Sequence, residues 1–494
     1  MNDRHTATAG DTVGTALYSA LRAVALGSPD APAVIGYDGA ASTYGRLLEA
    51  TDAAAAHLTG PAAPGCRILG VAVDDPFTFL AVYFAAAKLD LVAVLLDSRF
   101  TPDEKVRRAA KFDLDALVVE APAGGGAFEI EPIPPRDGQD SARNGYQPDD
   151  FVIHCTSGST GEPKGIVLSQ SAIMARVRSW SREIALGPDD VVLCALPLWH
   201  CHGIDILTLP ALLSGSTIVY ARAARLTGRG LARMIKAHEV SVVSGLPVMY
   251  QMLAATSGVE PAALASLRVA ITGSAPIAAD TQAVFRERFG LPLRQVYGLS
   301  EIGALTHDAA CMGAGTIGKP LLDTEFRLAP VEVFADGEQL SELYVRGPSL
   351  ARGYYRDAAA ESEMFVDGWL RTHDLIEVRP EGWYVRGRMS TFINVAGSKV
   401  APLEVEAAVR ECDGVLDCAV VGVSDGANGE QIAALIVVDS AVELDHVRRQ
   451  ASSRLLPYQL PQLYRVTAAV PRTPIGKIDY DAVRRAFQTE ELAL

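Results

Sequence analysis

The chain has 494 residues, more than one hydrophobic core normally serves, so we expect two or more domains. Its 59 acidic and 44 basic side chains give a net charge of −15. This balance argues against a general nucleic-acid binder and against a protein of anionic membrane surfaces. A small anionic ligand stays compatible, because it needs only a local positive site.

The cysteines and the N-terminal residues predict a cytoplasmic protein. The seven cysteines are an odd number and form no CxxC pair, as expected of reduced thiols. The first residues, MNDRHTATAGDTVG, lack the basic region and apolar stretch of a signal peptide. The most apolar segment, 77–96, contains Lys88 and Asp90, so it predicts a buried helix and a strand and no membrane span.

Helical and extended patterns alternate through the first 120 residues. We expect helices over 13–26, 45–58, 77–88 and 102–111, and strands over 33–35, 67–73, 92–95 and 117–119. This alternation predicts parallel βαβ units and an α/β fold class. Residues 121–149 are rich in Pro, Gly and Asp and are expected to form an irregular surface connection.

Residues 151–168, FVIHCTSGSTGEPKGIVL, combine two apolar runs with a loop of small residues. The runs 151–153 and 166–168 predict two strands. Between them, glycines allow backbone N–H groups to approach phosphate oxygens, the hydroxyls add donors, and Lys164 adds a positive charge. A flexible turn is the competing interpretation. A kinase-type P-loop is excluded, because Lys164 is not followed by Ser or Thr.

Residues 191–205, VVLCALPLWHCHGID, predict a strand that runs into a histidine-bearing turn. On the residues alone, a buried strand with two surface histidines is the simpler interpretation. A zinc site at His200, Cys201 and His202 is disfavoured, because adjacent residues rarely converge on one metal and no second ligand cluster follows.

Further elements are expected between the phosphate-type loop and residue 300. They are helices over 169–184 and 230–237, strands over 240–244 and 269–271, and a helix after Pro247. The last strand leads into TGSAP, residues 272–276, which by itself is an ordinary turn.

The stretch QVYGLSEIG, residues 295–303, places an aromatic ring, a hydroxyl and a carboxylate close together. Tyr297 can stack on a base, Gly298 allows close backbone approach, and Ser300 can bond phosphate. Glu301 can hold a magnesium ion that bridges phosphates. The alternative is a strand end with a solvated glutamate.

The pattern changes near residue 390. Helices over 403–411 and 443–455 and strands over 415–423, 431–438 and 463–467 predict a small α+β unit of about a hundred residues. Lys477 lies near its end, in PRTPIGKIDY; a lone lysine there would ordinarily be solvated. Before the change, Asp374 is expected just after a strand, in GWLRTHD.

Taken in order, TSGSTGEPKG, PLWHCHG, TGSAP, YGLSE, Asp374, the 384–406 stretch and Lys477 resemble the adenylate-forming superfamily. This superfamily contains acyl- and aryl-CoA synthetases, peptide-synthetase adenylation domains and luciferases. The resemblance spans roughly residues 30–480. It implies a large multi-layer N-terminal domain with mixed sheets, 1–388, and a small mobile C-terminal lid, 389–494.

The resemblance also implies roles for individual residues. Lys477, His200 and Glu301 would be catalytic, with Glu301 holding Mg²⁺. The ATP-binding residues would be Thr156, Ser157, Gly158, Ser159, Thr160, Gly161, Lys164, Gly273, Ser274, Ala275, Gln295, Tyr297, Gly298, Ser300, Asp374 and Arg388. The acid pocket would contain His200, Cys201, His202, Gly298, Leu299 and Gly303. Ser390 would be the hinge, and Ala396 and Gly397 would line the pantetheine path.

Three positions depart from the family pattern. His373 stands where a glycine usually precedes the ribose-binding Asp, which would place an extra ring near the nucleotide. Ser390 replaces the common Asp or Lys of the hinge, and Ala396 replaces the first of a frequent Gly-Gly pair.

The function that the resemblance implies is ATP-dependent activation of a carboxylic acid to an acyl-adenylate, followed by transfer to a thiol. The thiol would come from CoA or from the phosphopantetheine of a carrier protein. Members that select α-amino acids usually carry Asp directly after the aligned aromatic residue, where this chain has Cys201, which favours a plain carboxylic, aryl or fatty acid. His202 and Asp205 either make the pocket partly polar, which favours a polar aryl or short acid, or face solvent. A non-thiol acceptor and a catalytically silent homologue remain alternatives. The sequence predicts no nucleic-acid partner.

Overall fold

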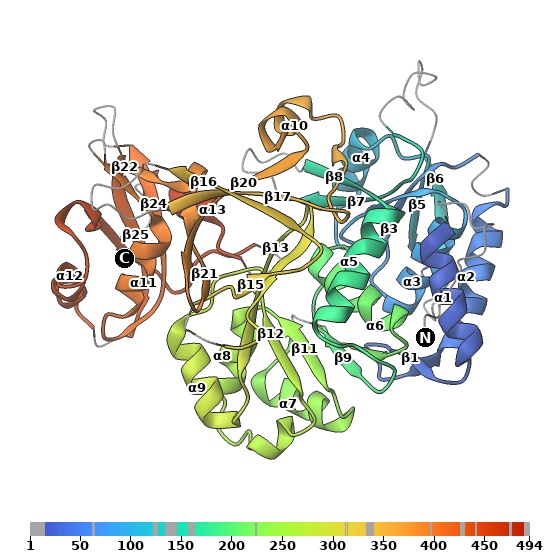
Figure 1. The fold of residues 1–494 in the computed structure, drawn as a ribbon, viewed down its shortest axis with the longest axis horizontal. Helices are drawn as coiled ribbons and strands as arrows, with labels where there is room; N and C mark the ends of the chain where they lie inside the picture. The colour runs from blue at the N-terminus through green and yellow to red at the C-terminus, as the bar shows by residue number, and fades with distance from the viewer. Residues whose placement is uncertain are drawn as a thin grey trace, which may run out of the picture.

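The computed structural model describes residues 15–61, 65–121, 127–133, 146–156, 164–222, 225–311, 313, 315–331, 340–395, 398–424, 430–439, 442–473 and 477–488. Within these residues the strands form five sheets, and helices pack beside them (Figure 1). No helix of the described residues is long and apolar enough to cross a membrane.

The first large sheet carries the strands that flank the phosphate-type loop. Its order is β18-β8-β7-β4-β3-β5-β6, with parallel pairing at its centre and antiparallel pairing of β6, β8 and β18 at the edges. Its strands are β3 (Ile68–Ala72), β4 (Val92–Leu95), β5 (Ala116–Glu120), β6 (Phe128–Pro132), β7 (Asp150–Thr156), β8 (Lys164–Ser169) and β18 (Gly353–Tyr354).

The second large sheet has the order β15-β14-β13-β12-β11-β9-β10-β1-β2. The run from β13 to β1 is parallel, whereas β2, β14 and β15 are antiparallel to their neighbours. Its strands are β1 (Pro32–Ile35), β2 (Ala41–Thr43), β9 (Val191–Cys194), β10 (Thr217–Tyr220), β11 (Val242–Gly245), β12 (Val269–Thr272), β13 (Leu293–Leu299), β14 (Gly303–His307) and β15 (Lys319–Pro320).

Helices of the N-terminal part pack against these sheets. Helix α5 (Gln170–Glu183) contacts β7 and β8 of one sheet and β14 of the other, so it brings the two sheets together. The other helices are α1 (Ala16–Gly27), α2 (Tyr44–Leu58), α3 (Pro76–Lys88), α4 (Pro102–Lys111), α6 (Leu209–Leu213), α7 (Gly228–Ala237), α8 (Pro247–Ala255) and α9 (Ala279–Phe289). A 3₁₀ turn, Pro261–Leu264, lies between α8 and α9.

A third sheet is antiparallel and follows in the chain. It consists of β16 (Glu325–Val331), β17 (Leu340–Arg346), β20 (Trp369–Arg379), β19 (Phe365–Val366) and β21 (Gly382–Arg388), with the short helix α10 (Ala358–Met364) beside it. Asp374 pairs with Arg388 across β20 and β21. The prediction that Asp374 follows a strand is therefore wrong, because Asp374 lies in the middle of β20.

The C-terminal part forms its own α+β unit with separate apolar clusters. The sheet β24 (Val415–Ser424), β25 (Glu430–Val438) and β26 (Leu463–Val466) carries helices α11 (Pro402–Arg410), α12 (Leu444–Ser452) and α13 (Tyr480–Gln488). A hairpin, β22 (Ile393–Val395) and β23 (Ser398–Val400), precedes it, and 3₁₀ turns lie at Met389–Thr391 and Pro457–Gln459. Helix α11 packs against β21, which joins this unit to the third sheet (Figure 1).

Local sequence signals explain many of these boundaries. Helix α4 begins where predicted, because Thr101 and Glu104 form a reciprocal capping box and Pro102 occupies the first turn. Two local predictions are wrong. Residues 121–149 contain strand β6, which pairs with β5 at a sheet edge, and the expected turn after His200 is a buried π-helix, His202–Thr208.

The π-helix depends on a close backbone contact at Gly203. A Cβ atom there would lie 2.3 Å from the carbonyl oxygen of Pro197. The atom it would meet belongs to the backbone, so no flexible side chain could move aside. The histidine-bearing segment can therefore fold back on itself only with glycine at this position.

We predict that Gly203→Ala lowers the free energy of unfolding by about 2 kcal/mol, because the new methyl group must displace Pro197. Urea unfolding measures the change. Gly27→Ala is the matched control, since a Cβ at Gly27 meets nothing within 4 Å, and its stability should match or slightly exceed that of the wild type. Equal stability of the Gly203→Ala protein would contradict the assigned contact.

Candidate active site

Three predicted nucleotide residues meet between the second and third sheets. The Tyr297 hydroxyl donates to Asp374 Oδ2 at 2.5 Å, and Arg388 Nε lies 3.5 Å from Asp374 Oδ1. Arg388 also donates to the Thr372 carbonyl at 3.1 Å. Burial raises the pKa of Asp374, although Arg388 and Tyr297 oppose this shift. The Asp374 carboxylate therefore has one hydrogen-bond donor, Tyr297, and one nearby cation, Arg388.

Glu301 is held by a tyrosine that sequence reasoning missed. The Tyr354 hydroxyl donates to Glu301 Oε1 at 2.6 Å, and Lys164 Nζ lies 5.3 Å from the centre of the Tyr354 ring. The backbone N–H of Ala351 donates to the Glu301 carbonyl at 2.6 Å. Glu301 and Lys164, 137 positions apart in the chain, are thus gathered around one aromatic side chain.

The histidine-bearing segment turns inward, with His202 buried and with His200 and Cys201 half-buried. His202 is 4% exposed, and its ring nitrogens lie 2.8 Å from the Ser274 and Ser244 hydroxyls. Cys201 Sγ lies 3.1 Å from Ser300 Oγ. The interpretation of surface histidines is therefore wrong, because the π-helix turns this segment inward against β11, β12 and β13.

Burial keeps both histidines neutral. Desolvation lowers the pKa of His202 to about 4, and the charge of Lys477 acts in the same direction. Desolvation likewise lowers the pKa of His200 to about 3, with further lowering by Lys477 and His202. At neutral pH these rings can donate or accept hydrogen bonds but carry no charge.

Lys477 reaches this region from the C-terminal unit. Although the residue keeps solvent exposure, desolvation lowers the pKa of its ammonium group. Cys201, Glu301 and Asp374 act to raise that pKa, and Arg388 acts to lower it. The groups that act on the pKa of Lys477 are thus all residues that the sequence predicts to bind acid or nucleotide.

The remaining predicted residues are distributed as follows. Gly273 and Ser274 lie beside His202, and Ala275 follows them. Gly298 and Leu299 end β13 and pair with Ala304 and Gly303 of β14. Gln295 is buried and donates to the Thr316 carbonyl at 3.1 Å.

Several predictions fall on residues whose side chains or backbone the structure does not describe. Thr156 pairs through its backbone with Lys164, and Ser390 lies in the turn Met389–Thr391. Outside the described residues lie Ser157, Gly158, Ser159, Thr160, Gly161, Ala396 and Gly397.

The ring of His373 contacts two carboxylates. Its Nδ1 lies 3.1 Å from Glu342 Oε1 and its Nε2 lies 3.5 Å from Glu363 Oε1. These two carboxylates hold the ring, whereas Asp374 contacts Tyr297 and Arg388, although His373 still acts to lower the pKa of Asp374. An extra ring near the nucleotide stays a prediction.

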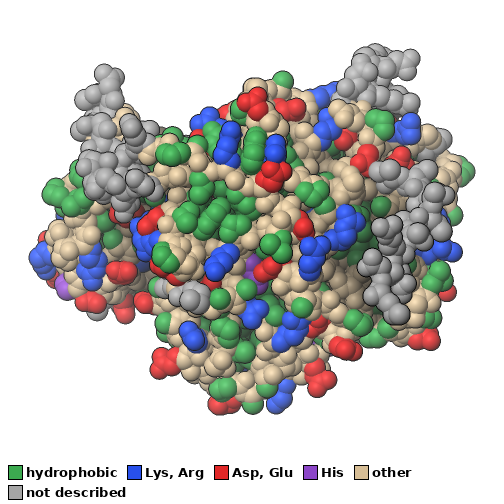
Figure 2. Space-filling model, viewed as in Figure 1, with side chains coloured by type: hydrophobic (Ala, Val, Ile, Leu, Met, Phe, Trp, Pro, Cys, Tyr) green, Lys and Arg blue, Asp and Glu red, His purple; other side chains and the backbone are tan. Residues whose placement is uncertain are grey.

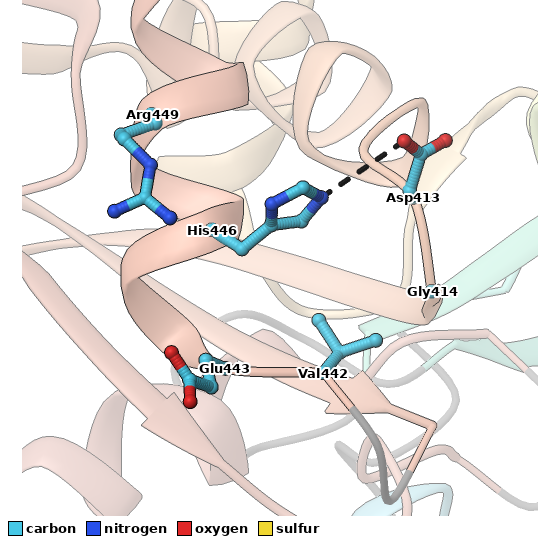
Figure 3. A pocket seen from close by; sticks show the side chains of 6 residues that line it. All are labelled: Asp413, Gly414, Val442, Glu443, His446 and Arg449. Carbon is cyan, nitrogen blue, oxygen red and sulfur yellow. Dashed lines mark ion pairs between the residues drawn. The ribbon is translucent and has the colours of Figure 1, made fainter.

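A surface pocket of the C-terminal unit lies apart from this cluster and contains none of the predicted site residues (Figure 3). In it, His446 of α12 points toward Asp413, with 3.9 Å between Nε2 and Oδ2. On the face seen in Figure 2, acidic and basic side chains are interspersed and no single-sign patch dominates. Among the described residues, no group of three or more His, Cys, Asp or Glu side chains could hold a metal ion.

Comparison with known proteins identifies the family. Residues 21–355 match the AMP-binding enzyme family, and residues 404–477 match the AMP-binding enzyme C-terminal domain. The chain belongs to the AMP-binding enzyme family. The resemblance inferred from the motifs is thereby confirmed, as is the fold class of a large mixed α/β domain followed by a small C-terminal domain.

Individual relatives agree with this assignment. The feruloyl-CoA synthase of an Amycolatopsis species is 31% identical over 482 residues, 93% of this chain and 96% of the relative. The indoleacetate–CoA ligase of Aromatoleum aromaticum is 31% identical over 408 residues, 79% of this chain and 78% of the relative. The ATP-bound MatB structure from Rhodopseudomonas palustris has a TM-score of 0.82 at 21% identity, covering 96% of this chain and 99% of that one.

The family and these CoA ligases establish the class of reaction. The protein is an AMP-forming acid–CoA ligase, which activates a carboxylic acid with ATP and then transfers the acyl group to a thiol. A catalytically silent homologue and a non-thiol acceptor are therefore disfavoured.

The depressed pKa of His202 predicts a pH dependence of stability. The unfolded chain binds a proton at this histidine below about pH 6.5, whereas the folded chain binds it only near pH 4. Stability must therefore fall as the pH drops from about 6.5 to about 4. In His202→Gln this fall should be smaller, by on the order of 2 kcal/mol. Urea unfolding at several pH values measures it, and an unchanged slope would place the titration on another group.

Proposed function

We propose that the acid substrate is an aromatic carboxylic acid with a hydrogen-bonding substituent, and that CoA accepts its acyl group. The observation that carries this proposal is the set of uncharged polar groups around the segment 200–202. His202 stands between two serine hydroxyls, and the Cys201 thiol lies beside Ser300. The relatives named feruloyl-CoA synthase and indoleacetate–CoA ligase support an aromatic acid.

Charge at the same place argues against an α-amino acid. Burial and the nearby Asp205 raise the pKa of the Cys201 thiol to about 11, so the thiol is neutral at pH 7. The Asp205 carboxylate is already paired with Arg176 at 2.7 Å. A substrate ammonium group would lose its hydration here without gaining a carboxylate partner, which is unfavourable.

The residues present fit ATP and magnesium. Asp374 offers carboxylate oxygens to two ribose hydroxyls, and Arg388 lies next to it to contact ribose or phosphate. Magnesium usually rests on one or two carboxylates together with substrate phosphates. Glu301 would supply such a carboxylate; the Tyr354 hydroxyl bonds one of its oxygens, and Lys164 lies over the ring of the same tyrosine. Bound there, the metal would neutralise phosphate charge.

In the first half-reaction a carboxylate oxygen of the acid attacks the α-phosphorus of ATP. An acyl–phosphate bond forms, the bond to the β-phosphate breaks, and pyrophosphate leaves. The Lys477 ammonium group stabilises the charge that develops on the α-phosphate. His200, neutral because its pKa is lowered to about 3, orients the acid by hydrogen bonding.

In the second half-reaction the thiol sulfur attacks the acyl carbonyl, the thioester forms and AMP leaves. We assign residues 389–494 to a lid that rotates about Ser390 between the two steps. The turn Met389–Thr391 supports this assignment, because it directly follows β21 and precedes the separate C-terminal core. Rotation would withdraw Lys477 and bring Ala396 and Gly397 to the pantetheine path. CoA and a carrier protein share that pantetheine arm.

The acid and the acceptor are tested by pyrophosphate release over a panel of acids, followed by thioester formation. The panel contains hydroxylated cinnamic, benzoic and arylacetic acids, short dicarboxylic acids, fatty acids and α-amino acids. We expect the highest kcat/KM with a hydroxylated aromatic acid, and thioester formation with CoA in preference to a phosphopantetheinylated carrier protein. Highest kcat/KM with a fatty acid or an amino acid would refute the proposed acid.

The two half-reactions can be separated by substitution. Lys477→Ala should lower pyrophosphate release by about 10²–10³-fold, because it removes one charge-stabilising contact, yet it should still convert supplied acyl-adenylate and CoA to thioester. Gly397→Leu should do the reverse, since a bulky side chain would obstruct the pantetheine path. Single-turnover assays on supplied acyl-adenylate measure this. Equal loss of both steps in folded Lys477→Ala would rule out the two-conformation mechanism.

A further inference from the structure

A buried ionic cluster lies beneath the candidate active site and has no role in the reaction outlined above. Asp205 Oδ2 accepts a hydrogen bond from Arg176 Nη1 at 2.7 Å and lies 3.1 Å from His154 Nε2. The three residues are 0%, 3% and 2% exposed. They come from the π-helix, from α5 and from β7, so the cluster joins three segments that are distant in the sequence.

The Asp205–Arg176 pair is ionised despite its burial. Burial acts to raise the pKa of Asp205, but His154 and Arg176 outweigh it and hold that pKa below the ordinary value. An ion pair in such a place costs desolvation energy, and an apolar pair of similar volume would often be as stable. Stability alone therefore does not account for these charges.

The other donors of Arg176 reach the two segments that grip Glu301. Nη2 donates to the Ser300 carbonyl at 3.1 Å, and Nε donates to the Ser349 carbonyl at 3.2 Å. Ser300 directly precedes Glu301. The segment after Ser349 supplies the Ala351 N–H and the Tyr354 hydroxyl, both of which bond Glu301. One guanidinium thus holds the backbone just before Glu301 and the start of the segment whose Tyr354 hydroxyl bonds the Glu301 carboxylate.

The packing of Arg176 leaves little freedom for either partner. Gly303, with φ +85°, lies so close that a Cβ atom would be 3.2 Å from both Cγ and Cδ of Arg176. The loop that carries Ser300 and Glu301 therefore rests directly on the arginine side chain. A rigid, planar fork of donors suits this arrangement, and lysine could not reproduce it.

We propose that Asp205 is a positioning residue for nucleotide activation: it orients Arg176, which in turn holds the Glu301 loop in the place where it meets magnesium and the ATP phosphates. His154 extends the same control to β7, the strand that enters the phosphate-type loop. The proposal rests on the proposed role of Glu301.

The test separates positioning from simple stability. Asp205→Leu leaves Arg176 buried without a counter-charge, so its unfolding midpoint should fall. In Asp205→Leu/Arg176→Met both charges are gone and the midpoint should return close to that of the wild type. The double variant nevertheless lacks the donors to Ser300 and Ser349. We expect its Kd for MgATP, measured by calorimetry, to rise about tenfold or more, and binding of ATP in EDTA to change less.

A control pair, Asp190 and Arg268, lies just before strands β9 and β12 of the second sheet. Arg268 donates to both oxygens of Asp190 at 2.7 Å and to the carbonyls of Ile184 and Ala185 at 2.9 Å, without contacting a predicted site residue. The Asp190→Leu/Arg268→Met pair has the same loss of a carboxylate and of donors to carbonyls. Because both charges are removed together and Arg268 is partly exposed, this pair should change the unfolding midpoint little, and it should leave the MgATP Kd unchanged.

Each result decides the matter. Wild-type MgATP affinity in the folded Asp205→Leu/Arg176→Met protein would overturn the proposal, as would an equal affinity loss in the control pair. If the double variant does not fold, Arg176→Lys keeps the charge, loses the fork, and must show the same weakened MgATP binding. A wild type that binds MgATP but releases no pyrophosphate with any acid would defeat the proposed function, while the binding comparison would still judge Asp205.

Discussion

The hydrogen bond between Asp205 and Arg176 is the interaction on which the arrangement of the site depends. A carboxylate that is completely buried must find partners, because leaving one member of a buried pair alone costs about 3–5 kcal/mol. Asp205 finds Arg176 and His154 on one oxygen. Arg176 also donates to the Ser300 and Ser349 carbonyls. This one side chain therefore links helix α5 to the π-helix and to the Glu301 loop, so these segments cannot move independently. The position of Glu301 is thus set by a charge pair outside its own loop.

A second constraint is the exclusion of charge from the histidine-bearing segment. His200 and His202 are neutral because burial depresses their pKa values to about 3 and 4, and Lys477 adds to that depression. Desolvation lowers the pKa of Lys477, and an anion placed nearby would stabilise its charged form. In the proposed mechanism, neutral donors would surround the acid and the Lys477 cation would stand at the phosphate, so the two ends of the reacting pair would meet complementary environments.

The C-terminal unit has a hydrophobic core separate from that of the large domain. It has its own apolar clusters, and it meets the large domain through α11 against β21 and through the reach of Lys477. The sequence distance between Lys477 and the loop at 156–164 is therefore no obstacle to a shared role. Inter-domain surfaces of this kind permit relative motion, which a two-step reaction with two different attacking groups requires.

Local chemistry in the sequence determined which elements form and which motifs carry the reaction. Helix α4 could be predicted to the residue from its capping box, and the order of TSGSTGEPKG, PLWHCHG, YGLSE and Lys477 predicted the family. Only the tertiary structure decided how these pieces meet. The π-helix that buries His202 against Ser274, the Tyr354 hydroxyl on Glu301, the contact of His373 with Glu342 and the Asp205–Arg176 pair join residues up to 72 positions apart. Periodicity and motif spacing report neighbours along one strand or helix, whereas buried hydrogen-bond partners are chosen by the packing of whole elements against one another.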